Sequence, residues 1–122
     1  MELSRSKRRN RKIMSIKAIC SNSGNKPREI PKENWVVSGN EYTIHHIYKQ
    51  MDPTQKGIQG CLLIEVSLEE LYKEGKTKHN CYRLDRFMFK KDDIQKLFDL
   101  IKECTELDDI DIKKELDLLI TI

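Results

Sequence analysis

The residues of this chain best suited to chemistry are three histidines and four cysteines. A thiol beside an imidazole can act as a nucleophile, and Cys61 or Cys81 with His45, His46 or His79 would supply such a pair. With this many histidines and cysteines, several such pairings are expected by chance. No acid, base and nucleophile converge in the sequence, so it predicts that the protein is not an enzyme.

The same residue types could instead hold zinc. His79 and Cys81 lie two residues apart, so on a strand both side chains would point to one face, and His46 or Cys61 could complete a tetrahedral set. The favoured alternative is that Cys20, Cys61 and Cys81 are small buried apolar residues, as free cysteines commonly are. The cysteines form no CxxC pair, and no apolar secretory segment follows the basic start of the chain. We therefore predict reduced thiols in a cytoplasmic protein, with no metal and no cofactor.

Aromatic residues interleaved with basic ones are a further candidate set. Its members are Trp35, Tyr42, Tyr48, Tyr72 and Tyr82, with Lys49, Arg83 and Arg86. Together they contain the parts of a face that stacks on bases or binds a peptide. Aromatic residues in strands are more often part of a core or of cross-strand pairs, so the structural role is favoured.

Strands must position most of these side chains, and the central pair of strands lies between residues 35 and 66. Alternation of apolar and polar residues predicts strands near 15–20, 35–38, 41–50, 58–66 and 81–85. In the longest of them, Tyr42, Ile44, His46 and Tyr48 would share one face. Gly60 suggests a bulge or bend that lets the sheet curl. The sequence thus predicts a strongly bent antiparallel barrel of about five strands.

Helices are predicted after this barrel. Ser67 and Glu70 have capping-box spacing, which predicts a single helical turn before the last strand. A longer helix, capped by Asp92 or Asp93, would follow at 94–104, where apolar residues recur at helical spacing. The final residues fit a helix or a strand; the helix is favoured because Asp108 and Asp109 offer N-cap chemistry.

Charge divides the chain of 122 residues into three parts. Residues 1–13 hold six basic residues and one acid, and we predict a disordered basic arm there. Residues 14–91, with a net charge of +4, would form the barrel domain, and residues 92–122, with a net charge of −6, an acidic amphipathic helical tail. The arm could contact phosphates, act as a solubilising tail, or precede a start at Met14. Apolar runs are too short for a membrane helix, so no membrane association is expected.

Three short motifs carry a resemblance to a known group of proteins. They are WVVSGNEYTI at 35–44, LLIEV at 62–66 and YRLDRF at 82–87, preceded by AIC at 18–20 and KPREIP at 26–31. Together they resemble small uncharacterised SH3-like barrel proteins of Bacteroidetes and their phages, over residues 15–89. The resemblance implies an SH3-like β-barrel and a mobile-element setting. It implies no activity and no site.

The leading hypothesis for function is a non-enzymatic binding or accessory protein of a phage or mobile element that acts through protein–protein contacts. Its contact residues, which could also form a homodimer, would be the apolar residues of the C-terminal helices: Ile94, Leu97, Phe98, Ile101, Leu116, Leu119 and Ile120. The alternative is nucleic-acid binding through the arm and one face of the barrel. That surface would consist of Arg5, Lys7, Arg8, Arg9, Arg11, Lys12, Lys49, Arg83 and Arg86.

Overall fold

A bent sheet lies at the centre of the molecule. The computed structural model describes residues 14–49 and 59–122, so the predicted arm at 1–13 lies outside the described residues. The strands follow the order β4-β3-β2-β1-β5-β6 across the sheet. Their bounds are β1 (Ile16–Cys20), β2 (Glu41–Tyr48), β3 (Gly60–Leu63), β4 (Tyr82–Arg83), β5 (Phe87–Phe89) and β6 (Ile120–Thr121). Strands β1 to β5 pair antiparallel as a half-barrel, and β6 joins β5 in parallel.

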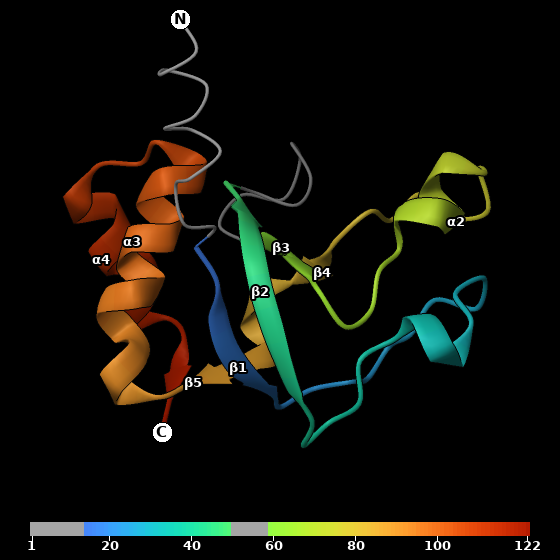
Figure 1. The fold of residues 1–122 in the computed structure, drawn as a ribbon, viewed down its shortest axis with the longest axis horizontal. Coiled ribbons are helices and arrows are strands. Elements are labelled where there is room, and N and C mark those ends of the chain that lie inside the picture. The colour runs from blue at the N-terminus through green and yellow to red at the C-terminus, as the bar shows by residue number, and fades with distance from the viewer. Residues whose placement is uncertain (1–13, 50–58) are drawn as a thin grey trace, which may run out of the picture.

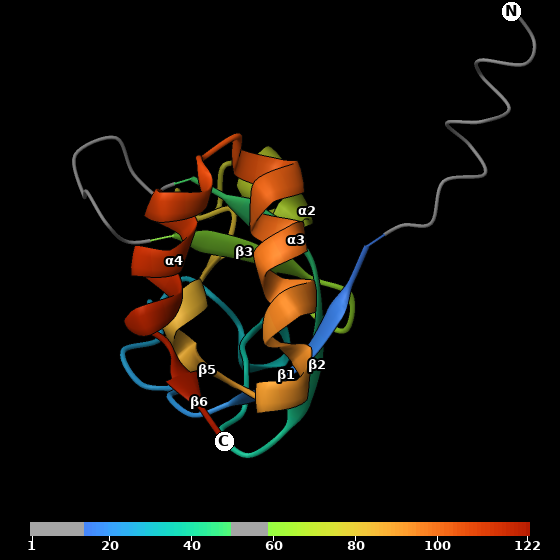
Figure 2. The same ribbon diagram turned by 90° about the vertical axis from the view of Figure 1, so that its left-hand side faces the viewer.

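The helices follow and interrupt this sheet. They are α2 (Glu69–Lys73), α3 (Ile94–Thr105) and α4 (Asp109–Asp117), with short 3-10 turns η1 (Lys32–Asn34), η2 (Leu84–Arg86) and η3 (Lys91–Asp93). The predicted antiparallel sheet with C-terminal helices is thereby confirmed in this coarse form. Helices α3 and α4 lie side by side on one face of the sheet (Figure 2). The segment 21–40 and α2 lie on the opposite side (Figure 1).

Both faces of the sheet are therefore covered, and the core follows from this. Helix α3 turns Leu97, Leu100 and Ile101 toward the sheet, where all three are buried, because its apolar residues recur at helical spacing. Phe87 and Phe89 from β5 are fully buried in the same hydrophobic cluster. No helix in the described ranges is long and apolar enough to cross a membrane.

The predicted strand at 35–38 is absent from the structure. Two of its backbone donors find partners nearby instead: Trp35 N–H donates to the Lys32 carbonyl, and Val37 N–H donates to the Tyr42 hydroxyl at 2.7 Å. Asn40 N–H then closes a turn on the Val37 carbonyl. A segment whose donors are satisfied locally has no need of a neighbouring strand. The fifth antiparallel strand is instead β5 at 87–89, just beyond the strand predicted near 81–85.

The C-terminal residues, whose pattern fitted either a helix or a strand, form one of each, α4 and then β6. Helix α4 begins at the predicted place, because the Asp108 carboxylate accepts a hydrogen bond from Asp111 N–H at 2.8 Å. The chain then turns into β6, and Ile122 N–H donates to the Phe89 carbonyl at 2.8 Å. One part of the ambiguous pattern is helix and the other is the edge of the sheet.

A β-bulge in β2 changes which residues face which layer. Ile44 pairs with Leu63 and His46 with Leu62, so His45 is the extra residue on β2. The alternation predicted along the whole strand is broken there, and Ile44 and Ile47 are both fully buried. Gly60, which the sequence singled out for a bulge, pairs regularly with Tyr48 on β2. The irregularity that bends the sheet thus lies at a histidine of the neighbouring strand.

Candidate functional site

A cleft of about 350 Å³ lies where β2 and β3 face α2. Its apolar lining comes from three tyrosines and four aliphatic residues: Tyr48, Tyr72, Tyr82, Leu62, Leu63, Val66 and Leu68. Its polar lining consists of His45, Ser67, Glu69, Lys73 and Asn80. This mixture of a mainly apolar wall and a few polar groups is typical of binding sites.

The bulge and the connection after β3 place these side chains. His45, the extra residue of β2, lines the cleft, as bulges often redirect a side chain next to a site. Helix α2 is anchored through Leu68, which is 1% exposed, and its first turn is fixed by Glu69 N–H donating to the Ser67 hydroxyl at 3.0 Å. Asn34 from η1 holds the same connection by donating to the Ser67 carbonyl at 3.0 Å. The connection that leads into α2, which forms one wall of the cleft, is therefore fixed to the loop that contains η1.

The structure separates the aromatic residues that the sequence grouped. Tyr48, Tyr72 and Tyr82 share the cleft. Tyr42 is buried in edge-to-face contact with Phe87 and belongs to the core. Trp35 lies outside the cleft lining, with its ring centroid 5.7 Å from that of Tyr82. Sequence alone could not separate them, because four of the five lie on three different secondary-structure elements and the fifth lies on a loop.

Two polar residues of the cleft lining pair with each other. Lys73 forms an exposed ion pair with Glu69 at 3.4 Å. Desolvation, and then the neighbouring His45, lowers the pKa of His46, while desolvation raises the pKa of the Tyr48 hydroxyl. Both shifts favour the neutral forms. Tyr48 lines the cleft, whereas His46 lies outside its lining and packs edge-on against the Tyr48 ring, with the ring centroids 4.7 Å apart.

Burial favours the neutral thiol form of Cys20, Cys61 and Cys81. Desolvation raises the pKa of Cys81 to about 11, and it also raises the pKa of Cys20 and Cys61. A nucleophile or metal ligand needs the thiolate. In the described ranges no three His, Cys, Asp or Glu side chains gather as metal ligands would, so His79 and Cys81 are not joined there by His46 or Cys61.

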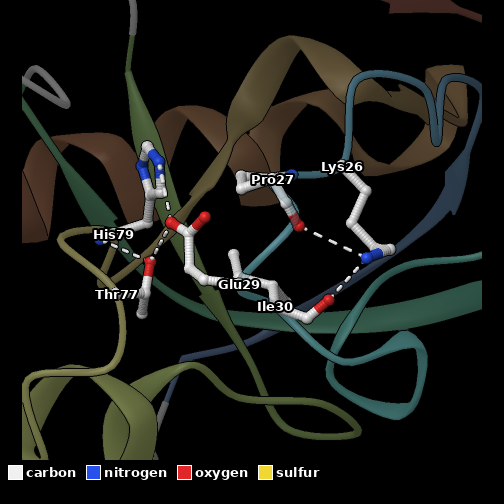
Figure 3. Close-up of polar contacts among 6 residues, drawn as sticks. All are labelled: Lys26, Pro27, Glu29, Ile30, Thr77 and His79. Carbon is white, nitrogen blue, oxygen red and sulfur yellow. Dashed lines mark hydrogen bonds and ion pairs between the residues drawn. The ribbon is translucent and has the colours of Figure 1, made fainter.

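His79 instead takes part in a cluster that ties two loops together (Figure 3). The Thr77 hydroxyl donates to Glu29 Oε2 at 2.9 Å, and His79 Nε2 lies 4.0 Å from the same oxygen. Hydrogen bonds from its own backbone and from Thr77 hold the pKa of Glu29 below its usual range. Lys26 closes the Glu29 loop by donating to the Ile30 carbonyl. The Thr77 hydroxyl also accepts from His79 N–H, so the cluster is a clamp between 26–30 and 77–79.

The structure divides the predicted protein-contact residues of the C-terminal helices. Leu97 and Ile101 are both 0% exposed within the chain's own core. Ile94, Leu116 and Leu119 line a shallow groove beside β6, and Phe98 is half-buried against the core. The side chain of Ile120 lies outside the described residues. The large exposed apolar residues of this region are others, namely Ile110, Leu118 and Ile122.

The basic residues predicted for nucleic-acid contact are also divided. The six residues of the arm, from Arg5 to Lys12, lie outside the described residues, and Lys49 is exposed at the end of β2. Arg83 is paired with Asp85 through contacts of 2.8 and 3.1 Å. Arg86 is 8% exposed and lies over the Trp35 ring, 4.8 Å from its centroid. Thus Arg83 and Arg86 are both engaged within the chain, Arg83 at the surface with Asp85 and Arg86 in a buried position.

Comparison of the chain with models of protein families, with curated proteins and with solved structures gave no match. The resemblance to SH3-like barrel proteins is left as an expectation by this result. The geometry of the chain itself is therefore the basis for a function, and the feature that bears on it most is the tyrosine-lined cleft.

Proposed function

We propose that this chain is a non-enzymatic peptide-binding protein whose docking site is the cleft between β2, β3 and α2. The observation that carries the proposal is the convergence of Tyr48, Tyr72 and Tyr82 around a concave space of about 350 Å³. Aromatic rings supply large rigid contact area at low entropic cost, and they dominate peptide and protein interfaces. The proposed binding surface is this cleft and not the C-terminal helices favoured by the sequence, because Leu97 and Ile101 of those helices are buried in the core.

An extended peptide with apolar side chains fits this cleft best. Tyr82 belongs both to the cleft lining and to β4, which is an edge strand of the sheet. A peptide added along such an edge gains main-chain hydrogen bonds and directs alternate side chains into neighbouring pockets. Tyr72 is 48% exposed at the opposite wall, so a ligand would cover a ring that water now covers.

The finer identity of the protein belongs to the same proposal. The SH3-like barrel type and the phage or mobile-element setting are supported by the resemblance of the motifs at 35–44, 62–66 and 82–87. Self-association through the C-terminal helices stays a prediction from the sequence.

Peptide selection tests this proposal directly. A library of random displayed peptides is selected on the full chain, and the affinity of an enriched peptide is measured for the wild type, Tyr72→Ala and Val37→Ala. Tyr72 and Val37 are similarly exposed, at 48% and 49%, but only Tyr72 lines the cleft. We expect Tyr72→Ala to weaken binding on the order of tenfold, as loss of an aromatic interface residue does, and Val37→Ala to leave it within about twofold.

Two outcomes would contradict the proposal. One is a selection that enriches no peptide. The other is an enriched peptide that binds Tyr72→Ala as tightly as the wild type, or that shifts amide signals of the C-terminal helices and leaves those of 62–73 unchanged.

A further inference from the structure

A second, smaller pocket lies on the other side of Tyr82 and has a different chemistry. It has a volume of about 100 Å³, and Tyr82 lines both this pocket and the peptide cleft. We propose that this pocket binds a small oxyanion, of the phosphate or carboxylate class, between Arg86 and Arg83. The site is separate from the proposed peptide cleft, and its existence does not depend on that function.

Arg86 is the buried cation at this pocket. It lines the pocket and is 8% exposed, so its guanidinium has lost most of its contact with water. Its Nη1 donates to the carbonyls of Asn22 and Gly24, both at 2.9 Å. Its Nε is buried without a hydrogen-bond partner. Only two of its five N–H donors are thus used in bonds within the described residues.

In the part of the chain that the structure describes, no carboxylate forms an ion pair with Arg86, although the charge of Asp85 acts on it from a distance. None of the described residues that line the pocket is acidic. Burial, and then the neighbouring charge of Arg83, lowers the pKa of Arg86. A buried charge is usually paired, since desolvation costs several kcal/mol otherwise. The Trp35 ring and two carbonyls offset part of that cost, and an anion would supply the missing opposite charge.

The rim of the pocket suits an anion as well. Arg83 is exposed there, and its contacts with Asp85 use Nε and Nη2. Pro27 and His79 form another part of the lining, and both are held by the Glu29 clamp (Figure 3). Asn25 adds an exposed amide. Glu29 and Asp85 are the nearby acids, and each already contacts a basic side chain of the rim.

Size restricts the ligand to one small group. A volume of about 100 Å³ corresponds to roughly three water molecules. That admits a single phosphate or carboxylate group and not a nucleotide. Guanidinium groups bind both oxyanions through paired hydrogen bonds, so the two are distinguished by experiment.

The single tryptophan makes the site easy to observe. Trp35 lines the pocket and stacks on Arg86, and its indole N–H donates to the Ser23 carbonyl at 2.8 Å. The experiment follows the Trp35 indole and Arg86 Nε–H signals by NMR on the full chain. Inorganic phosphate is the probe, sodium acetate is the carboxylate arm, and sodium chloride at equal ionic strength is the reference. We expect a saturable shift with phosphate, acetate or both, and none with chloride.

A charge variant at the rim tests the placement without disturbing Arg86. Asn25→Asp puts a negative charge beside the anion and should fold, since Asp tolerates the φ of 60° found there. Gln95→Glu makes the same charge change on α3, across the sheet. We expect Asn25→Asp to weaken oxyanion binding on the order of tenfold, and Gln95→Glu and Tyr72→Ala to leave it within about twofold.

The proposal would be overturned by a response that does not saturate or that chloride reproduces. It would also be overturned if a folded Asn25→Asp bound phosphate or acetate as tightly as the wild type. A wild-type chain that binds a selected peptide but no oxyanion would argue against this site alone. A chain that binds an oxyanion but no peptide would argue against the peptide cleft alone.

Discussion

At the scale of single residues, the Glu65 carboxylate hydrogen-bonds to β2 at Thr43, close to the bulge at His45. Glu65 accepts two hydrogen bonds of 2.7 Å from Thr43, one from the backbone N–H and one from the side-chain hydroxyl. Desolvation opposes the charged form of Glu65, yet these hydrogen bonds outweigh it and lower the pKa of the carboxyl. Glu65 therefore stabilises the native state in its ionised form.

Glu65→Gln is expected to lower the free energy of unfolding at pH 7, because it weakens two charge-assisted hydrogen bonds. The loss should be only about 1 kcal/mol, because Glu65 is partly solvated. A folded pKa below the unfolded value gives stability that is present above the unfolded pKa and lost as pH falls through the folded one. The difference between wild type and variant should thus shrink below about pH 4.5. Urea unfolding across pH measures it.

Glu33→Gln is the matched control, since Glu33 is an exposed carboxylate in η1. It should change the free energy of unfolding by less than about 0.5 kcal/mol at any pH. A pH-independent loss in Glu65→Gln would contradict the role given to its charge.

At the scale of elements, α4 depends on its N-cap residue, Asp108. Asp108 caps the helix, and Ile112 in the next turn is 0% exposed. Asp108→Ala should lower the free energy of unfolding by about 1 kcal/mol. Asp117→Ala is the control at the other end, where an acid is unfavourable to the helix dipole and its removal should cost nothing. Equal losses of stability in both variants, by thermal unfolding, would argue against the cap.

The elements also show how far the sequence alone could lead. Periodicity located α3, β1 and β2 correctly, because each has a run of several residues that faces a covered layer. For α4 the periodicity was ambiguous, and the N-cap chemistry of Asp108 indicated the helix. It failed at 35–38, where the Tyr42 hydroxyl and a turn satisfy backbone groups that a strand would have paired. The cleft was not predictable as a site, since His45 enters it only through a bulge in pairing with β3. Tyr48, Tyr72 and Tyr82 could be named from the sequence as candidate binding residues, but that they share one cleft follows only from the fold.

At the scale of the whole molecule, the acidic tail is part of the fold. Helix α4 buries Ile112, and β6 pairs with β5. Deleting residues 106–122 should therefore lower the midpoint of thermal unfolding by more than 10 °C or prevent folding, because loss of one buried aliphatic contact alone costs about 2–5 kcal/mol. A tail that only served as an interface would leave the midpoint unchanged.

Leu118→Glu separates surface from fold in the same region. Leu118 is 73% exposed, so the variant should keep the wild-type midpoint within about 2 °C. If the C-terminal helices join two copies, the same variant should halve the mass measured by light scattering. A variant that unfolds would contradict the exposed position of Leu118.

The seam between the end of β1 and η2 has a consequence for how the chain folds. Ile19 pairs with Met88, and Ser21 and Asn22 N–H both donate to the Arg86 carbonyl, so segments more than 60 residues apart must meet. Contacts of such sequence separation carry a large loop-closure entropy and slow the search for the native topology. The β2–β3 pairing can form earlier from a shorter loop. Closure of β1 on β5 should then be the slow step in refolding, and it is this step that buries Arg86 beneath Trp35.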